Sequence, residues 1–174
     1  MQNSDATLDV VASLLTAEED TPLRLRFARE FGPSASVSAA QFSYLLQSEF
    51  VVAAEVAEGF TPQQVLAVLD DELERFLQSR PTPIEVELVR RQILRSHTGG
   101  VASHLTRAAR LSEFSVYTQG DPGLTNLNFS RYLSITPAIV QRTARRWLDR
   151  SHRLTVLVQR YTNGNAFVQY QEGR

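Results

Sequence analysis

The chain has 174 residues, a length that fits one domain and allows a sizeable core without covalent cross-links. Its 43% hydrophobic and 21% charged residues are typical of a globular protein. The lack of cysteine excludes disulfides, iron–sulfur clusters and thiolate zinc sites. No run approaches the ~20 apolar residues of a membrane span. The polar, acidic start does not match a secretory signal, so we expect a soluble chain of unknown compartment.

The charge of the chain is unevenly distributed. All 18 basic residues are arginine, which indicates a GC-rich, bacterial genome. Residues 1–87 hold 15 acids and 5 arginines, whereas residues 88–174 hold 4 acids and 13 arginines. We expect these halves to pack together through complementary charge or to solubilise separate faces. Nucleic-acid binding through the arginine-rich half remains an alternative.

The first elements in chain order are helical. Leu8, Val11, Ala12 and Leu15 recur at three and four residues, which predicts an amphipathic helix. After the acidic Glu18-Glu19-Asp20 and Pro22, the pair Leu23 and Phe27 predicts a short second helix that ends before Gly32.

The next pattern is extended. Alternation from Ser34, with Ala35, Val37 and Ala39 on one side, predicts a half-buried strand. The continuous apolar run 50–54 favours a strand buried on both faces, joined to the first by a hairpin at 45–48. Near the end, 154–158 predicts a closing strand, and 166–170 predicts an added edge strand or an ordered tail.

Three helices are predicted to begin with the same chemistry, at Thr61-Pro62, Thr82-Pro83 and Thr136-Pro137. Threonine caps free backbone N–H groups, and proline fits the first helical position. Gln64 and Glu85 complete capping boxes in the first two. The pattern buries Val65, Leu69, Leu73 and Phe76 in the first helix, and Val140, Ala144, Trp147 and Leu148 in the third. The second begins with Val86, Val89 and Ile93 and extends to about Leu111, with Gly99-Gly100 as its weak point.

No catalytic pattern emerges from the reactive side chains. His97 and His104 are two helical turns apart, too far to share a metal, and His152 suits the end of the last helix. A serine-hydrolase motif and a phosphate-binding loop are absent from the sequence. The acidic clusters Glu18-Glu19-Asp20 and Asp70-Asp71-Glu72 are interpreted as solvated surface. Arg142, Arg145 and Arg146 form the best basic patch, interpreted as a solvated face or a partner contact.

The order of these elements resembles one half-domain of the insulinase-type (pitrilysin, inverzincin) zinc peptidases, including the processing-peptidase and respiratory core-protein branches. The resemblance covers about residues 4–159 and rests on the order and spacing of several stretches. These are 8–15, 27–32, 35–39, the Thr61-Pro62 helix, 83–94, 120–122, 132–140, 144–148 and 154–158.

This resemblance implies an α+β fold, with one mostly antiparallel sheet flanked by helices and the family's first strand missing. It implies a half-domain over 1–161 and a C-terminal extension or added edge strand over 162–174. In the family, one half supplies a His-x-x-Glu-His zinc motif, and the other supplies an arginine and a tyrosine that hold the peptide. The chain resembles the second, non-catalytic half, because it has no such zinc motif.

The resemblance also indicates which positions would hold substrate. Aligned on Gly32, the family arginine falls on Ala28 and the family tyrosine on Ala35; a slip of one residue offers Arg29 but restores no tyrosine. We therefore expect no catalytic, metal-binding or substrate-binding residue, no cofactor and no activity from this chain alone. The expected role is a structural or substrate-closing partner of a zinc-bearing peptidase half or a homologous half-domain. Partner contact is expected at the sheet edge and at the groove facing the other half, where a peptide could add as an extra strand. The alternative is a lobe of an active zinc metalloendopeptidase whose metal lies elsewhere.

Overall fold

A computed structural model describes residues 3–44, 46–99, 104–117, 130–160 and 166–172. Helices α1 (Asn3–Thr16) and α2 (Pro22–Phe31) precede the strands β1 (Val37–Ser43) and β2 (Ser48–Ala54). Helices α3 (Pro62–Gln78), α4 (Pro83–Gly99), α5 (His104–Tyr117) and α7 (Pro137–Trp147) follow. The short 3-10 helix η1 (Arg150–His152) leads into β3 (Leu154–Arg160) and β4 (Ala166–Glu172). The predicted α+β class with antiparallel strands is confirmed.

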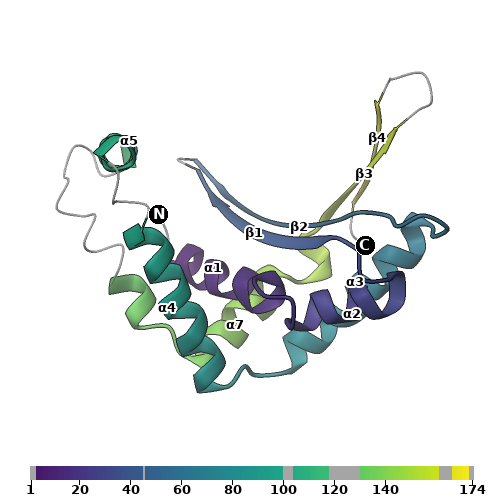
Figure 1. Cartoon of the computed structure of the whole chain (residues 1–174), viewed down its shortest axis with the longest axis horizontal. Helices are drawn as coiled ribbons and strands as arrows, with labels where there is room; N and C mark the ends of the chain where they lie inside the picture. The colour runs from purple at the N-terminus through teal and green to yellow at the C-terminus, as the bar shows by residue number, and fades with distance from the viewer. Residues whose placement is uncertain (1–2, 45, 100–103, 118–129, 161–165, 173–174) are drawn as a thin grey trace.

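The core is built around α1, which the β1–β2 hairpin covers on one side and α2, α4 and α7 contact on others (Figure 1). Its predicted stripe, including Val11 and Leu15, is fully buried. The helix is covered nearly all round, because Asp5, Thr7 and Thr16 are buried as well. Buried polar groups need partners. Ser43 and Ser48 donate hydroxyl hydrogen bonds of 3.1 and 3.2 Å to Asp5 Oδ2.

The three predicted threonine–proline starts are confirmed. In α3, the Gln64 N–H donates to Thr61 Oγ1, and the Thr61 N–H donates to Gln64 Oε1 at 2.8 Å. Thr82 and Glu85 form the same reciprocal pair at the start of α4, and Thr136 accepts from the Ile139 N–H at the start of α7. Local chemistry of this kind sets helix starts without help from distant residues.

Strands β1 and β2 form an antiparallel pair in which Val37 faces Ala54 and Ser43 faces Ser48. The predicted hairpin is confirmed, and the Tyr44 N–H donates to the Gln47 carbonyl at its turn. The predicted burial of β2 on both faces is wrong. Phe50, Val52 and Ala54 pack against the core, whereas alternate residues such as Val51 are exposed, since nothing in the described chain covers the second face.

The strands form two pairs instead of one continuous sheet. β1 pairs only with β2, and β3 pairs only with β4, within the described residues. The antiparallel β3–β4 register places Leu154 opposite Glu172, so the predicted edge strand after 165 is present. The predicted long second helix corresponds to two helices, α4 up to Gly99 and α5 from His104, and residues 100–103 lie outside the described residues. The stretches 120–122 and 162–165 lie outside the described residues.

Helix α7 serves partly to close the end of α3. The last carbonyls of a helix have no partner within the helix. Gln141 Nε2 donates to the carbonyl of Ser79 at 3.0 Å, and Arg145 Nε donates to the carbonyl of Leu77 at 2.7 Å. Val140 and Ala144 are fully buried and Leu148 packs against the core, as predicted. Trp147 was predicted in the core but is 42% exposed, because its face of α7 borders an open groove.

Candidate functional site

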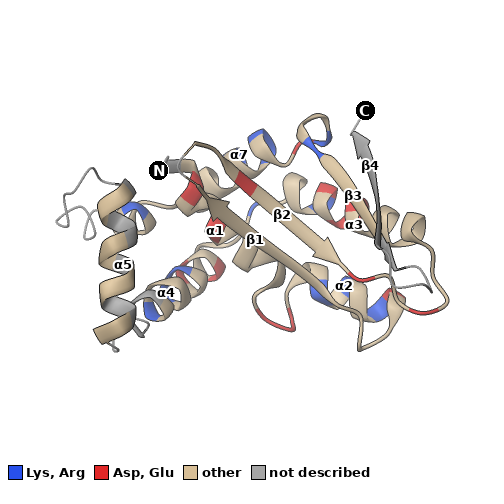
Figure 2. Ribbon diagram, turned by 90° about the horizontal axis from the view of Figure 1, so that it is seen from above, with Lys and Arg blue, Asp and Glu red and all other residues tan. Residues whose placement is uncertain are grey.

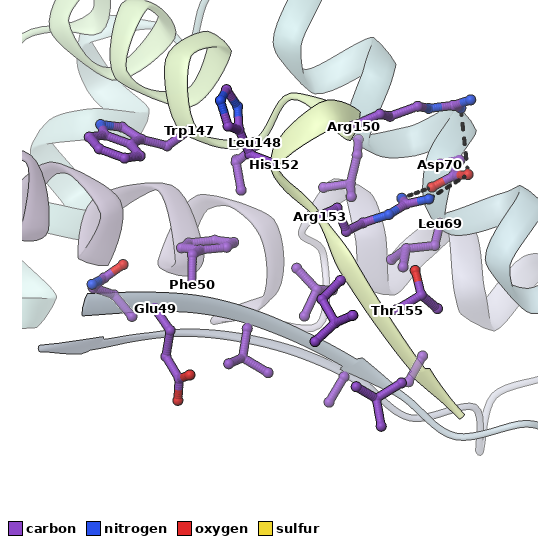
Figure 3. A pocket seen from close by; sticks show the side chains of 18 of the residues that line it. Glu49, Phe50, Leu69, Asp70, Trp147, Leu148, Arg150, His152, Arg153 and Thr155 are labelled. Atoms are coloured by element: carbon purple, nitrogen blue, oxygen red, sulfur yellow. Dashed lines mark hydrogen bonds and ion pairs between the residues drawn. The ribbon is translucent and has the colours of Figure 1, made fainter. Parts of the chain in front are cut away.

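A groove of about 2170 Å³ lies between β2 and β3. Its walls are the two strands, Ser48–Ala54 and 154–158, and its floor comes from α1, α3 and α7 (Figure 3). β2 and β3 run in the same general direction in Figure 2, and residues of both line the groove. The groove therefore separates the two strand pairs above a common layer of helices.

The floor of the groove is apolar. Leu8 comes from α1, Leu69 and Leu73 come from α3, and Trp147 lies at the end of α7. Phe50 points from β2 toward this layer (Figure 3). Leu8, Leu69 and Leu73 are largely buried, whereas Trp147 is 42% exposed and leaves apolar surface open to water.

Strand β3 presents apolar side chains that remain exposed. Leu154 is 57%, Val156 45% and Val158 67% exposed, and all three line the groove. A strand rich in leucine and valine at alternate positions is typical of a strand with a covered face. In the described chain, that cover is missing.

The edge of β2 that faces the groove can be assigned from the hydrogen-bond register. The Glu55 N–H donates to the Ser36 carbonyl and the Tyr44 N–H to the Gln47 carbonyl, which places residues 49, 51, 53 and 55 in hydrogen-bonded pairs with β1. Residues 48, 50, 52 and 54 consequently direct their backbone N–H and C=O groups to the other edge. The same register explains why the Ala39 N–H, on the outer edge of β1, reaches Thr16 Oγ1 at 2.9 Å.

One end of the groove holds a charge network. Asp70 of α3 accepts hydrogen bonds from Arg153 and lies 3.6 Å from Arg150 Nη2 (Figure 3). Asp70 belongs to the acidic half of the sequence and both arginines to the basic half, so opposite charges join the two halves at this point. Beside them, hydrogen bonds from the hydroxyl and backbone N–H of Ser151 lower the pKa of the exposed Asp149 carboxyl below its ordinary value.

The interpretation of Asp70-Asp71-Glu72 as solvated surface is wrong for two of the three residues. The side chain of Asp70 is only 15% exposed, because it faces Arg153 across the groove. Glu72 is 9% exposed and lies 3.7 Å from Arg75 Nη1. Asp71 alone fits the interpretation, with a side chain 47% exposed between Arg26 and Arg75. The other cluster, Glu18-Glu19-Asp20, is exposed as expected.

The two alanines at the predicted substrate-holding positions flank one turn. The Gly32 N–H donates to the Ala28 carbonyl, and the Ala35 N–H donates to the Gly32 carbonyl at 3.0 Å. Gly32 has a φ of 94°, a backbone conformation that favours glycine. Ala28 is half-buried, Ala35 packs against the core, and Arg29 is exposed. The methyl side chains offer neither a donor nor an acceptor to a peptide.

The remaining candidates are dispersed. His97 and His104 lie on separate helices, α4 and α5, and His152 is exposed at η1 on the rim of the groove. No three His, Asp or Glu side chains gather as a metal-binding group in the portion that the structure describes. Arg142, Arg145 and Arg146 are exposed, but Arg145 caps α3 and Arg146 lies over the Trp147 ring at 5.2 Å.

Across the described ranges, no helix has both the length and the apolar character of a membrane span.

A groove and a sheet edge for partner contact were expected from the resemblance, but the residues that line the groove were not predicted. Two of its signals were visible in the sequence, the apolar alternation at Leu154, Val156 and Val158 and the apolar Trp147. By itself, the first pattern predicts a closing strand, and the second predicts a buried core position. That these positions meet at one uncovered site depends on the separation of the two strand pairs, which no local pattern reports.

Comparison with known proteins shows the fold. The chain matches no family model and no curated protein. Among solved structures, it resembles the "inactive peptidase domain of a putative zinc protease" from Bordetella parapertussis, with a TM-score of 0.77 and 20% identity over 98% of this chain and 83% of that one. It also resembles a "putative zinc protease" from Bordetella pertussis Tohama I, with a TM-score of 0.74 and 23% identity over 87% and 82% of the two chains.

A third structure is a protease from Helicobacter pylori, with a TM-score of 0.69 and 13% identity over 85% of this chain but 35% of that one. At these identities, the likeness establishes the fold. The chain thus has the α+β fold shared by these zinc protease and peptidase structures.

Proposed function

We propose that this chain is a non-catalytic, insulinase-like peptidase domain that acts as a structural or substrate-closing partner of a zinc-bearing peptidase half. The observation that carries the proposal is the likeness to an inactive peptidase domain over 98% of the chain. A fold alone does not determine activity, so the residues at the relevant positions matter. Those positions hold Ala28 and Ala35, and the sequence contains no His-x-x-Glu-His motif.

In this proposal, zinc and the chemistry of peptide hydrolysis belong to the other half. Metal-assisted hydrolysis needs ligands that leave an open coordination position for water. The chain would contribute a surface that holds the zinc-bearing half in place or closes over its substrate. The groove between β2 and β3 offers such a surface, because it combines an apolar floor with uncovered strand edges.

The proposal can be tested on the purified chain. We expect no stoichiometric zinc by elemental analysis after dialysis against the metal, and no cleavage of unstructured peptides. Tight zinc at one ion per chain, or peptide hydrolysis by the chain alone, would contradict the proposal.

The alternative, a lobe of an active peptidase, differs in what happens on mixing. A zinc-bearing half from the same assembly would be added and the cleavage of unstructured peptides followed. Cleavage that appears only in the mixture supports the substrate-closing lobe. A stable complex without cleavage supports the structural partner, and the absence of any complex contradicts both.

A further inference from the structure

We infer that the groove between β2 and β3 binds one extended strand of a partner polypeptide, about seven residues long, with apolar side chains at alternate positions and a basic residue at each end. The inference rests on the proposed partner role and specifies the surface that such a partner would occupy. Four observations lead to it: two facing strand edges, an apolar floor, uncovered apolar side chains, and an excess of acidic groups.

The first observation concerns backbone hydrogen bonding. Ser48, Phe50, Val52 and Ala54 turn their N–H and C=O groups away from β1, and no strand pairs with that edge in the described chain. β3 is paired on one edge only, so every second residue of β3 also presents its backbone groups to the groove side. Exposed strand edges are templates for pairing with another chain. A single strand inserted here would satisfy both edges at once.

The length of the occupant follows from the two edges. β2 and β3 each have seven residues, which corresponds to about 20 Å of extended chain. The groove between them is open along β2 from Ser48 to Ala54. A segment of about seven residues therefore matches both walls, whereas a helix would leave the backbone groups of both edges without partners.

The side-chain pattern of the occupant follows from the floor. An inserted strand turns alternate side chains toward the helices and the others away. The side chains turned inward would meet Leu69, Leu73 and Trp147, which are apolar. They would also cover Val156, which is 45% exposed in the absence of a partner. Apolar residues at every second position thus fit the groove, and recognition of this kind is known as strand addition.

The charges along β2 indicate which residues the partner strand should carry at its ends. No basic residue lies between Arg29 and Arg75, a stretch that contains eight carboxylates and the whole of β2. Glu49 near the start of β2 and Glu55 just after its end both line the groove, six positions apart. Acidic segments lie at both ends of β2 in Figure 2. Arg150 and Arg153 lie just before β3, where Asp70 engages them. A partner strand with lysine or arginine at both ends would complement Glu49 and Glu55.

The experiment uses the whole chain and a defined probe, the seven-residue peptide Arg-Val-Thr-Val-Thr-Val-Arg. Backbone amide exchange would be followed residue by residue, with and without the peptide. We expect slowed exchange at the amides of Phe50, Val52 and Ala54. The amides of Val51 and Ala53 already pair with β1 and should change little. Uniform protection along β2, or none, would overturn the inference.

Two matched variants test whether the peptide binds in the groove. Val156→Glu places a charge in the groove wall and should weaken peptide binding about tenfold or more. Val116→Glu on α5 makes the same change at a residue that is 66% exposed and does not line the groove, so it should leave binding unaltered. Equal effects of the two variants would contradict the inference.

A peptide with glutamate in place of each terminal arginine should bind more weakly than the arginine peptide. The double variant Glu49→Gln and Glu55→Gln should lose this preference without losing protection at Phe50. Equal binding of both peptides to the unaltered chain would overturn the charge assignment.

A second copy of this chain is the competing occupant. Sedimentation over a range of concentrations should show a monomer in the absence of peptide. A concentration-dependent dimer in which the Phe50 and Val52 amides are already protected would overturn the inferred partner. If the peptide binds as expected but no zinc-bearing half associates, the strand site stands and the proposed function fails, so the two outcomes can be distinguished.

Discussion

At the scale of single residues, a few polar contacts join segments that are far apart in the sequence. Tyr132 is 3% exposed, and its hydroxyl donates to Asp9 Oδ2 at 2.6 Å across 123 residues of sequence. Tyr132→Phe should lower the free energy of unfolding by about 1–3 kcal/mol, because it removes a buried hydrogen bond to a charged group. Tyr44→Phe, at an exposed residue whose hydroxyl donates to Glu49 at 3.3 Å, is the matched control and should cost far less. Urea unfolding of the two variants measures the difference.

The same residue predicts a pH dependence. Burial, with the Asp9 charge and hydrogen bond, raises the pKa of Tyr132 above its ordinary value of 10.0. A group with a raised folded-state pKa contributes stability that is fully present below its unfolded pKa and is lost as the pH rises beyond it. The stability gap between the unaltered chain and Tyr132→Phe should thus narrow as the pH rises above about 10. A gap that widens with pH would contradict this assignment.

Asp70 is a second residue whose contacts join segments that are far apart in the sequence. It joins α3 to the chain after α7 through Arg153, and the two side chains are 15% and 28% exposed. Asp70→Asn should lower the free energy of unfolding by about 1–3 kcal/mol, since it leaves a partly buried arginine without its carboxylate. Asp71→Asn, with a side chain 47% exposed, should change stability by less than about 1 kcal/mol. Thermal or urea unfolding measures both losses. An equal loss in the free energy of unfolding for the two variants would contradict the prediction that the more buried ion pair matters more.

At the scale of elements, the helix starts show what local chemistry can determine. Thr82→Ala removes the acceptor for the Glu85 N–H, and should lower the free energy of unfolding by about 1 kcal/mol. Thr82→Ser keeps the hydroxyl and should retain most of that stability. Loss of stability in the serine variant as large as in the alanine variant would show that the methyl group, not the cap, is responsible.

The elements also show where sequence patterns stop being informative. All three threonine–proline starts were predicted because caps depend on neighbours three residues away. The burial of Val51 and Trp147 was predicted wrongly, because a period shows which residues share a face but not whether another element covers it. The break between α4 and α5 was foreseen only as a weak point at Gly99-Gly100. The residues that line the groove could not be predicted, because the groove arises from how two strand pairs are placed.

At the scale of the whole molecule, the uneven charge of the sequence has a structural use. The acidic half carries the β1–β2 hairpin and α3, and the basic half carries α7 and β3. The halves meet at Asp70 and Arg153, while the β2 side of the groove keeps its carboxylates. The fold shared with the inactive peptidase domain thus occurs here with a groove between β2 and β3 and with alanine at Ala28 and Ala35.

The most direct measurement is a titration of this chain with a zinc-bearing half from the same assembly, followed through the backbone amides of the chain. We predict a complex in which the amides of Phe50, Val52 and Ala54 become protected, with zinc bound to the added half alone. A complex that leaves these amides unchanged would contradict the assigned surface. Zinc bound to this chain in the complex, or no association at all, would contradict the proposal that it is a non-catalytic partner.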